Sequence, residues 1–382
     1  MEEPTTHTTE INHWDDLNLK TNLLRGIYAV GFENPSEIQK KAILPVLSKN
    51  DVIAQAQSGT GKTGTFSISS LQLTDPEVDE LQTLIIAPTQ ELARQIFSVV
   101  NSIGIFIDGL QTQLLVGGTS VQGDIDKLRK ATPHIVVGCS GRIFDMMKRR
   151  HLNINTVKLF VLDEADEMLS QGFKEQIYNI FQYLNSNVQV ALFSATLPRD
   201  VLQLTEKFMQ DPVNITMKRE DLSLDGIDQR YIAMYTDNEK FEMVKKIFEE
   251  LTVSQTIIYT NNVKRVMDLY DAMINEGFPV CCIHSSMEKN ARTLALDEFR
   301  AGKYRVLISS NVTARGIDIQ QVGTVINFDV PRCVHTYLHR IGRSGRWGRK
   351  GMAINFVTEH DIHNMKHIES HYNIIIKEFS TK

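Results

Sequence analysis

Cysteine is scarce in this sequence, and no two cysteines have a metal-binding spacing. The four cysteines among 382 residues are Cys139, Cys281, Cys282 and Cys333, and none belongs to a CxxC pair. A disulfide framework and a zinc finger are therefore not expected, and a reducing compartment is.

Long apolar runs and an excess of basic charge are also missing. No hydrophobic stretch approaches the roughly 20 residues that a membrane span needs, and residues 1–10 carry no basic side chain or export signal. The formal net charge of -5 excludes a protein that holds nucleic acid by bulk electrostatics, so any such contact must be local. We expect a monomer without membrane contact, located in the cytoplasm, with a nuclear location left open.

Short apolar runs rich in β-branched residues alternate with helix-like segments throughout the chain. In the first half, the expected strands are 51–54, 83–87, 135–137, 157–162 and 188–193. In the second half, they are 256–259, 280–283, 305–308, 324–328 and 353–357. The expected helices include 91–100, 173–183 and two apolar stripes within 241–251 and 263–273. This alternation predicts two α/β domains, each a parallel sheet flanked by helices.

The boundary between the domains is expected at residues 219–226. This segment is charged, lacks periodicity and ends in glycine, as a linker does. Residues 31–218 would form the first domain and residues 227–382 the second. Residues 1–30 would be an N-terminal segment that leads into the first domain.

A phosphate-binding loop is indicated after the first expected strand. Its residues are Ala56, Gln57, Ser58, Gly59, Thr60, Gly61, Lys62 and Thr63. Gly59 and Gly61 would permit a tight turn whose N–H groups face phosphate oxygens. Lys62 would reach the β- and γ-phosphates of ATP, and Thr63 would offer a hydroxyl to Mg²⁺. Ala56 stands at the first glycine position of the general pattern.

An acidic segment follows the apolar run 157–162. Asp163 and Glu164 would therefore emerge at the carboxyl end of a strand, where α/β sheets bind ligands. Asp163 would hold Mg²⁺, and Glu164 would polarise the water that attacks the γ-phosphate. The first half of the sequence thus predicts hydrolysis of ATP with Mg²⁺.

Basic residues are concentrated near the C-terminus and are spaced by glycines. They are Arg340, Arg343, Arg346, Arg349 and Lys350. Taken alone, the segment favours a solvated basic loop. With a phosphate loop in the first half, its arginines could instead stabilise charge on the transferred phosphoryl group, so that hydrolysis would depend on domain closure.

These segments, in this order, closely resemble the DEAD-box RNA helicases of helicase superfamily 2, over nearly the whole chain. The resemblance implies two RecA-like domains and an enzyme that uses ATP to bind, bend and unwind or remodel single-stranded RNA, largely without base readout. Protein scaffold partners are also implied. Segments 23–28, 173–178 and 348–357 look most like the members that act in translation initiation and their exon-junction paralogue.

The resemblance assigns further residues to the ATP site. Segment 31–39 looks like the family's adenine-recognising Q motif, in which Gln39 would read adenine with Phe32 packed nearby. Trp14 stands near the family's isolated upstream aromatic residue, and core packing explains it equally well. Segment 314–318 resembles motif V. Its ATP-binding residues would be Gly316 and Asp318.

The remaining assignments concern charge stabilisation, coupling and RNA. Arg343 and Arg346 match the family's arginine fingers. The residues that would couple ATP to RNA are Ser194, Thr196, Asp166 and His339. The residues that would contact RNA are Pro88, Thr89, Gly117, Gly118, Ser140, Gly141, Arg142, Asn261 and Ser310.

The departures from the family pattern gather on the RNA side. The altered positions are Gln90, Cys139, Ser140, Lys289, Ser310 and Asn311. Gln90 lacks the charge of the family's arginine, whereas Lys289 adds charge. We hypothesise looser coupling between RNA binding and ATP turnover. An RNA-stimulated ATPase as strong as that of a standard member, at matched salt, would contradict this hypothesis.

Two other functions are open from the sequence. One is an ATP-gated RNA clamp or an mRNA- or rRNA-processing factor like the exon-junction paralogue, which slow RNA release with bound ATP would favour. The other is a P-loop kinase or an ATPase without a nucleic-acid partner. The arginine-rich segment in a second α/β domain argues against this last function.

Overall fold

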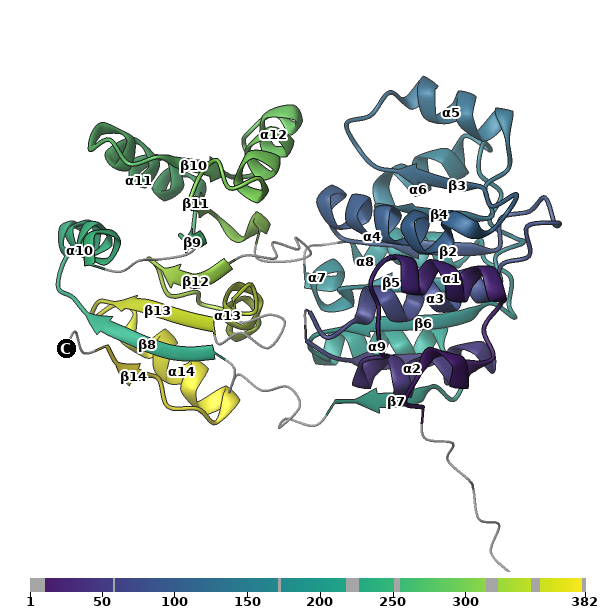
Figure 1. Cartoon of the computed structure of the whole chain (residues 1–382), viewed down its shortest axis with the longest axis horizontal. Helices are drawn as coiled ribbons and strands as arrows, with labels where there is room; N and C mark the ends of the chain where they lie inside the picture. Colours follow the sequence, from purple (N-terminus) through teal and green to yellow (C-terminus); the bar gives the residue numbers. More distant parts are fainter. Residues whose placement is uncertain are drawn as a thin grey trace, which may run out of the picture. The chain divides into compact units, whose positions relative to one another are not determined.

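The computed structural model describes residues 11–57, 59–170, 173–217, 227–250, 255–313, 322–344 and 351–379. The chain divides into two compact units, Met1–Lys218 and Arg219–Lys382. Each unit contains one seven-stranded sheet whose described neighbours are all parallel (Figure 1). The expectation of two parallel sheets flanked by helices is confirmed. The expected linker, 219–226, lies outside the described residues.

The sheet of the first unit has the order β3-β4-β2-β5-β6-β1-β7. Its strands are β1 (Val52–Gln55), β2 (Thr83–Ile86), β3 (Thr112–Leu115), β4 (Ile135–Gly138), β5 (Leu159–Asp163), β6 (Gln189–Ser194) and β7 (Val213–Thr216). Every residue of β2, β4, β5 and β6 is buried, because helices cover both faces, so these strands read as continuous apolar runs. The edge strands β3 and β7 are only partly buried, and the sequence did not predict them.

Nine described α-helices and two short 3₁₀ segments accompany this sheet. They are η1 (Trp14–Leu17), α1 (Thr21–Ala29), α2 (Glu37–Leu47), α3 (Lys62–Leu73), α4 (Gln90–Ile103), η2 (Gly104–Phe106), α5 (Val121–Lys130), α6 (Ser140–Lys148), α7 (Ala165–Ser170), α8 (Lys174–Phe181) and α9 (Arg199–Phe208). Helix α3 packs against α2 and α4, and almost all of its residues are buried. The helix that follows the phosphate loop is therefore held on several sides.

The second unit repeats the topology of the first. Its sheet has the order β10-β11-β9-β12-β13-β8-β14, which becomes the order of the first sheet when its strands are counted from β8. The strands are β8 (Ile227–Ala233), β9 (Gln255–Tyr259), β10 (Val280–Ile283), β11 (Val306–Ser309), β12 (Val322–Asn327), β13 (Gly351–Val357) and β14 (Lys377–Glu378). The two units are thus two versions of one fold.

The helices of the second unit bury the apolar stripes that the sequence predicted. They are α10 (Asp237–Glu250), α11 (Val263–Asn275), α12 (Lys289–Arg300), η4 (Asn311–Thr313), α13 (Val334–Ile341) and α14 (Ile362–Tyr372). Val244 and Ile247 of α10 share one core cluster with Val266 and Met273 of α11. These stripes belong to the core, as expected.

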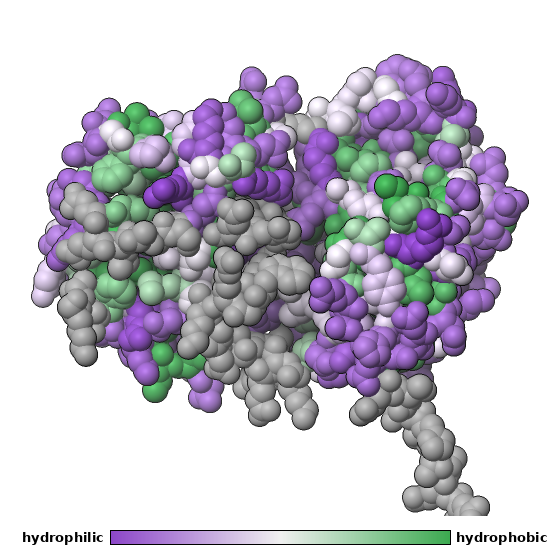
Figure 2. Space-filling model, in the orientation of Figure 1, coloured by the Kyte–Doolittle hydropathy of each residue, from purple (hydrophilic) through white to green (hydrophobic). Residues whose placement is uncertain are grey.

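The surface carries apolar residues mainly in small patches. In Figure 2, hydrophilic residues predominate on the visible face of each unit, and hydrophobic residues form small areas between them. Within the described part of the chain, no helix is both long and apolar enough to cross a membrane.

Candidate functional site

The phosphate loop connects the end of β1 to the start of α3, as the sequence predicted. Gly59 has φ +87° and Gly61 has φ +107°, both in the left-handed region that favours glycine. A Cβ atom on Gly61 would lie 2.6 Å from Ser36 Oγ, so a larger residue would also clash there. The hydroxyl of Thr60 donates a hydrogen bond to the Gln57 carbonyl at 2.8 Å and closes the loop.

The predicted adenine-binding segment packs directly on this loop. Gln39 Nε2 donates to the Gly61 carbonyl at 3.3 Å, and Gln39 Oε1 accepts from Ser36 N at 2.6 Å in the capping box of α2. A Cβ atom on Gly64 would lie 3.1 Å from Phe32 Cε2, so the Phe32 ring covers the first turn of α3. The Q-motif residues and the phosphate loop therefore form one cluster.

Trp14 is a buried core residue that packs against Phe32 of this cluster. Its side chain is fully buried, and its indole Nε1 donates to the Phe32 carbonyl at 3.0 Å. The two rings are stacked with centroids 6.4 Å apart. Trp14 thus fixes the backbone at Phe32.

The predicted acidic pair lies opposite the phosphate loop. Strand β5 ends at Asp163, and α7 begins two residues later; Glu164 between them has φ +51°. This left-handed backbone costs on the order of 1 kcal/mol in a non-glycine residue. The sharp turn brings Glu164 Oε1 to 3.5 Å from Lys62 Nζ, while Asp163 Oδ1 accepts from Glu164 N at 3.0 Å.

Three carboxylates of the acidic segment 163–166 are buried at this point. Asp163, Glu164 and Asp166 are all buried, and Lys62 is the cation that contacts Glu164. Burial, followed by the charge of Glu164, raises the pKa of Asp163 to about 7, and Lys62 opposes the rise. A divalent cation would stabilise the charged form of these carboxylates, and carboxylate and hydroxyl oxygens are the donors that Mg²⁺ prefers.

Hydrogen bonds link the acidic segment to the end of β6. Thr196 Oγ1 donates to Asp166 Oδ2 at 2.7 Å, and Asp166 N donates to Ser194 Oγ at 3.2 Å. The Ser194 carbonyl in turn accepts from Ala56 N of the phosphate loop at 3.0 Å. Three of the four predicted coupling residues therefore form one cluster, and the fourth, His339, belongs to the second unit.

Arg142, a predicted RNA contact, has partners within the protein. It forms an ion pair with the buried Asp124, and its guanidinium donates to the Thr119 hydroxyl and carbonyl at 2.9 Å each. At the start of the same helix, α6, Ser140 Oγ donates to Gln176 Oε1 at 2.8 Å. Arg142 thus anchors the loop that follows β3, a function that the sequence did not suggest.

The altered residue Gln90 lies against another predicted RNA contact. A Cβ atom on Gly117 would lie 3.1 Å from Gln90 Nε2, and the next residue, Gly118, has φ +69°. Thr89 caps α4 by accepting a hydrogen bond from Leu92 N at 3.2 Å. The change at Gln90 therefore falls at the contact between α4 and the double-glycine loop.

The other predicted site residues lie in or beside the helices named above or outside the described part of the chain. Pro88 lies between β2 and α4, Thr63 in the first turn of α3, and Gly141 in the first turn of α6. The predicted residues outside the described part are Ser58, Gly316, Asp318 and Arg346.

Arg340 of the C-terminal basic segment is buried, so the expectation of a solvated loop is wrong for this residue. Within the described part of the chain, the acceptors to which its guanidinium donates, at 2.7–3.3 Å, are neutral. These are the side-chain oxygens of Asn261, Asn311 and Asn327 and the carbonyls of Thr260 and Asp329. Burial lowers the pKa of Arg340 to about 10, against the opposing effects of Tyr259 and Asp329. One arginine thus orients the predicted RNA contact Asn261 and the altered residue Asn311.

One sequence signal could have indicated that Arg340 is buried, although not which residues it contacts. Arg340 lies between Tyr337 and Ile341, which are both fully buried apolar positions of α13. An arginine inside such a stripe needs several acceptors. At the end of the same helix, Arg343 Nε donates to the His339 carbonyl at 3.2 Å, and Ser310 is buried just after β11.

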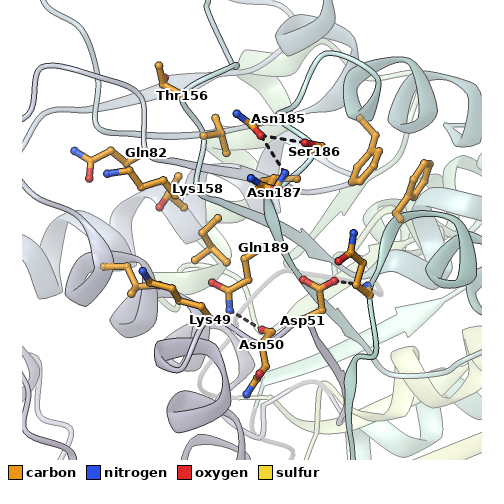
Figure 3. Close-up of a pocket in the computed structure, with 18 of the residues that line it drawn as sticks. Lys49, Asn50, Asp51, Gln82, Thr156, Lys158, Asn185, Ser186, Asn187 and Gln189 are labelled. Carbon is orange, nitrogen blue, oxygen red and sulfur yellow. Dashed lines mark hydrogen bonds between the residues drawn. The ribbon is translucent and has the colours of Figure 1, made fainter.

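A separate cavity of about 760 Å³ opens at the amino ends of the strands of the first sheet (Figure 3). Two of its buried polar side chains have partners within the protein. Gln189 Nε2 donates to the Asn50 and Val46 carbonyls at 2.6 and 2.8 Å. Asp51 likewise accepts from two backbone N–H groups at 2.7 Å each. None of the predicted site residues lines this cavity, so we assign no ligand to it.

Comparisons with known proteins agree with the nucleotide site. The sequence matches the DEAD/DEAH box helicase family over residues 36–204 and the helicase conserved C-terminal domain over residues 239–348. It is 51% identical to the ATP-dependent RNA helicase eIF4A of Chaetomium globosum, over 96% of this chain and 92% of the relative. The corresponding protein of Emericella nidulans is 52% identical, over 96% and 91%. The solved structure of S. cerevisiae Dbp5 bound to RNA and ADP BeF3 matches with a TM-score of 0.89 and 35% identity, over 96% of this chain and 95% of that one. The chain therefore belongs to the DEAD/DEAH box helicase family and is an ATP-hydrolysing enzyme.

Proposed function

We propose that this protein is an ATP-dependent RNA helicase that binds, bends and unwinds or remodels RNA in translation initiation. The identity to eIF4A proteins over almost the whole chain supports the biological role. The observation that carries the chemistry is the 3.5 Å contact between Lys62 Nζ and Glu164 Oε1, beside the buried Asp163. We further propose that the protein is cytoplasmic, acts as a monomer and works with protein scaffold partners.

In this proposal, ATP binds between the Q motif and the phosphate loop. Gln39 and Phe32 hold the adenine, since both lie against the first turns that follow the loop. Backbone N–H groups of the loop face the phosphates, and Gly59 and Gly61 supply the conformation that this requires. Lys62 leaves Glu164 and binds the β- and γ-phosphates, so nucleotide replaces an internal ion pair.

Thr63 and Asp163 would hold Mg²⁺. The ion, when bound, neutralises charge on the β- and γ-phosphates. The buried carboxylates of Asp163, Glu164 and Asp166 lie close together in sequence at the end of β5, and carboxylate oxygens are ligands that Mg²⁺ prefers, which supports this assignment.

Once Lys62 has turned to the phosphates, the Glu164 carboxylate is available to accept a proton from the attacking water. The positive φ of Glu164 holds that carboxylate on the side of the phosphate loop. Arg343 and Arg346 of the second domain, 227–382, would stabilise charge on the transferred phosphoryl group, and Gly316 and Asp318 would help to hold ATP. Hydrolysis then requires domain 31–218 and the second domain to close.

RNA would bind to both domains through its sugars and phosphates. In the first domain, Arg142 would act by fixing Thr119 next to the double-glycine loop. In the second domain, Arg340 would present Asn261. Asp166, Ser194 and Thr196 would transmit the state of the nucleotide, because their hydrogen bonds reach the phosphate loop.

Steady-state ATP hydrolysis with and without single-stranded RNA tests this proposal. We expect RNA to stimulate turnover and Glu164→Gln to lower it by about 10² to 10⁴-fold while ATP binding persists. The exposed Glu175→Gln on α8 is the matched control and should keep full activity. Turnover that depends on Glu164 but does not respond to any RNA would contradict the helicase function.

A further inference from the structure

Histidines are concentrated in one part of the second unit. Six of the eleven in the chain lie between positions 335 and 371, namely His335, His339, His360, His363, His367 and His371. Three of them form a group: the ring centroids of His335 and His371 are 5.5 Å apart, and those of His367 and His371 are 6.5 Å apart. His335 belongs to α13 and the other two to α14, and these helices pack against each other.

The ring distance between His335 and His371 is close to that of two imidazoles that share one metal ion. His367 and His371 are four residues apart and therefore lie on one face of α14, the spacing of helical zinc-binding histidine pairs. With metal–nitrogen distances of about 2.0–2.1 Å, two imidazoles at a tetrahedral ion have centroids about 5 Å apart. The 5.5 Å pair almost meets this value and the 6.5 Å pair exceeds it. The donor nitrogens of the three side chains do not all lie within 4.8 Å of one another, so sharing one ion requires side-chain rotation. Such a rotation is possible because His367 and His371 are exposed and His335 is half-buried.

We propose that His335, His367 and His371 form a binding site for Zn²⁺ or a similar late first-row divalent metal ion. A donor set of imidazole nitrogens selects Zn²⁺, Cu²⁺ or Ni²⁺ over Mg²⁺, which prefers oxygen. The neighbouring cation Lys366 does not oppose binding strongly, because it is paired with Glu369 at 2.9 Å.

The bound ion would join two helices that otherwise meet through side-chain packing. His335 lies one turn before His339 on α13, and the same helix carries the buried Arg340. Tyr372 OH of α14 already donates to the Val334 carbonyl at 3.0 Å, so one hydrogen bond joins the two helices close to His335. Zn²⁺ would therefore stiffen the helix that leads to the arginine-rich segment.

Calorimetric titration of the full-length protein with Zn²⁺, in excess Mg²⁺, tests the proposal. We expect one ion per chain, and His371→Ala should weaken binding most because His371 neighbours both other rings. His335→Ala and His367→Ala should each lower the affinity by about tenfold or more. His151→Ala, on the first unit, is the control and should bind Zn²⁺ unchanged. Circular dichroism of each variant separates loss of the site from loss of the fold.

Three results would overturn the assignment. The first is the absence of Zn²⁺ binding by the unaltered protein. The second is binding that survives His335→Ala but is lost in both His363→Ala and His367→Ala, because the ion would then sit on α14 alone. The third is dependence on Cys333, seen as loss of binding in Cys333→Ser or as a thiolate band in the Co²⁺ spectrum.

Discussion

Two buried charged clusters, one in each unit, differ in how well the protein stabilises their charge. In the first, burial and the charge of Glu164 raise the pKa of Asp163 to about 7, so the protein itself disfavours the charged form of this carboxylate. In the second, Arg340 is buried among neutral acceptors that satisfy its guanidinium. A cluster whose charged form the protein disfavours is completed by a ligand from outside, whereas a satisfied cluster supports the fold itself. The comparison therefore separates a binding site from a structural centre.

We expect the greatest loss of stability when Arg340, a buried arginine of the second unit, is replaced. Arg340→Met should destabilise the second unit by about 3–5 kcal/mol, because several buried acceptors lose their donor together. Urea unfolding followed by circular dichroism measures the loss. The control is Arg300→Met, at an arginine 40% exposed on the side-chain surface, which should change stability by less than about 0.5 kcal/mol. Equal effects of the two substitutions would break the comparison.

Substitution of Asp163 in the binding site should change stability in the opposite direction, by raising it. The raised pKa of Asp163 means that the folded protein holds a proton which the unfolded chain releases, so stability falls as pH rises from about 4 to about 7. Asp163→Asn removes this cost. It should stabilise the nucleotide-free protein by at least about 1 kcal/mol at pH 8, with a smaller gain near pH 5, and abolish ATP hydrolysis.

Urea unfolding of the nucleotide-free protein at several pH values, without Mg²⁺, checks this prediction. Asp126→Asn at an exposed position of α5 is the control and should show no such pH-dependent gain. An Asp163→Asn variant that is less stable than the parent at every pH would show that this carboxylate stabilises the fold and is not a destabilising group kept for cation binding.

We expect the smallest change in stability from a substitution beside Arg340 in the second unit. Asn311 Oδ1 accepts from Arg340 Nε at 2.9 Å and Nη2 at 2.7 Å, so Asn311→Asp would place a carboxylate on the same two donors. We expect a gain of about 1 kcal/mol, limited because Asn311 is exposed. A double-mutant cycle with Arg340→Met checks that the gain belongs to this pair. A loss of stability would show that the pocket is built for a neutral partner.

Much of the nucleotide site could be predicted because its parts are local in sequence. The phosphate loop and the acidic pair each follow a strand buried on both faces, and such strands are visible as apolar runs. The left-handed conformations of Gly59 and Gly61 could be predicted because the loop sequence calls for a tight turn. The edge strands β3, β7 and β14, and β8 next to the edge, escaped prediction because they are at least partly exposed and their sequences are mixed.

The partners of two arginines could not be predicted, because they depend on contacts far apart in the chain. Arg142 pairs with Asp124 from the preceding helix, so a residue expected at the RNA surface is used to hold a loop. Arg340 gathers asparagines from three separate loops and strands, and neither charge nor glycine spacing reveals that arrangement. Local patterns identify where chain segments end, and long-range packing decides which side chains remain available.

The shared strand order has a further consequence for how this architecture can change. Counting strands from the start of each sheet, β5 of the first unit corresponds to β12 of the second; β5 ends in Asp163, and β12 ends in Asn327, which accepts from Arg340. One repeated scaffold thus places an aspartate at the end of a central strand in the first unit and an asparagine held by Arg340 at the corresponding position in the second. A second nucleotide site at that edge would require at least a glycine-rich connection after β8 and an acid at the end of β12.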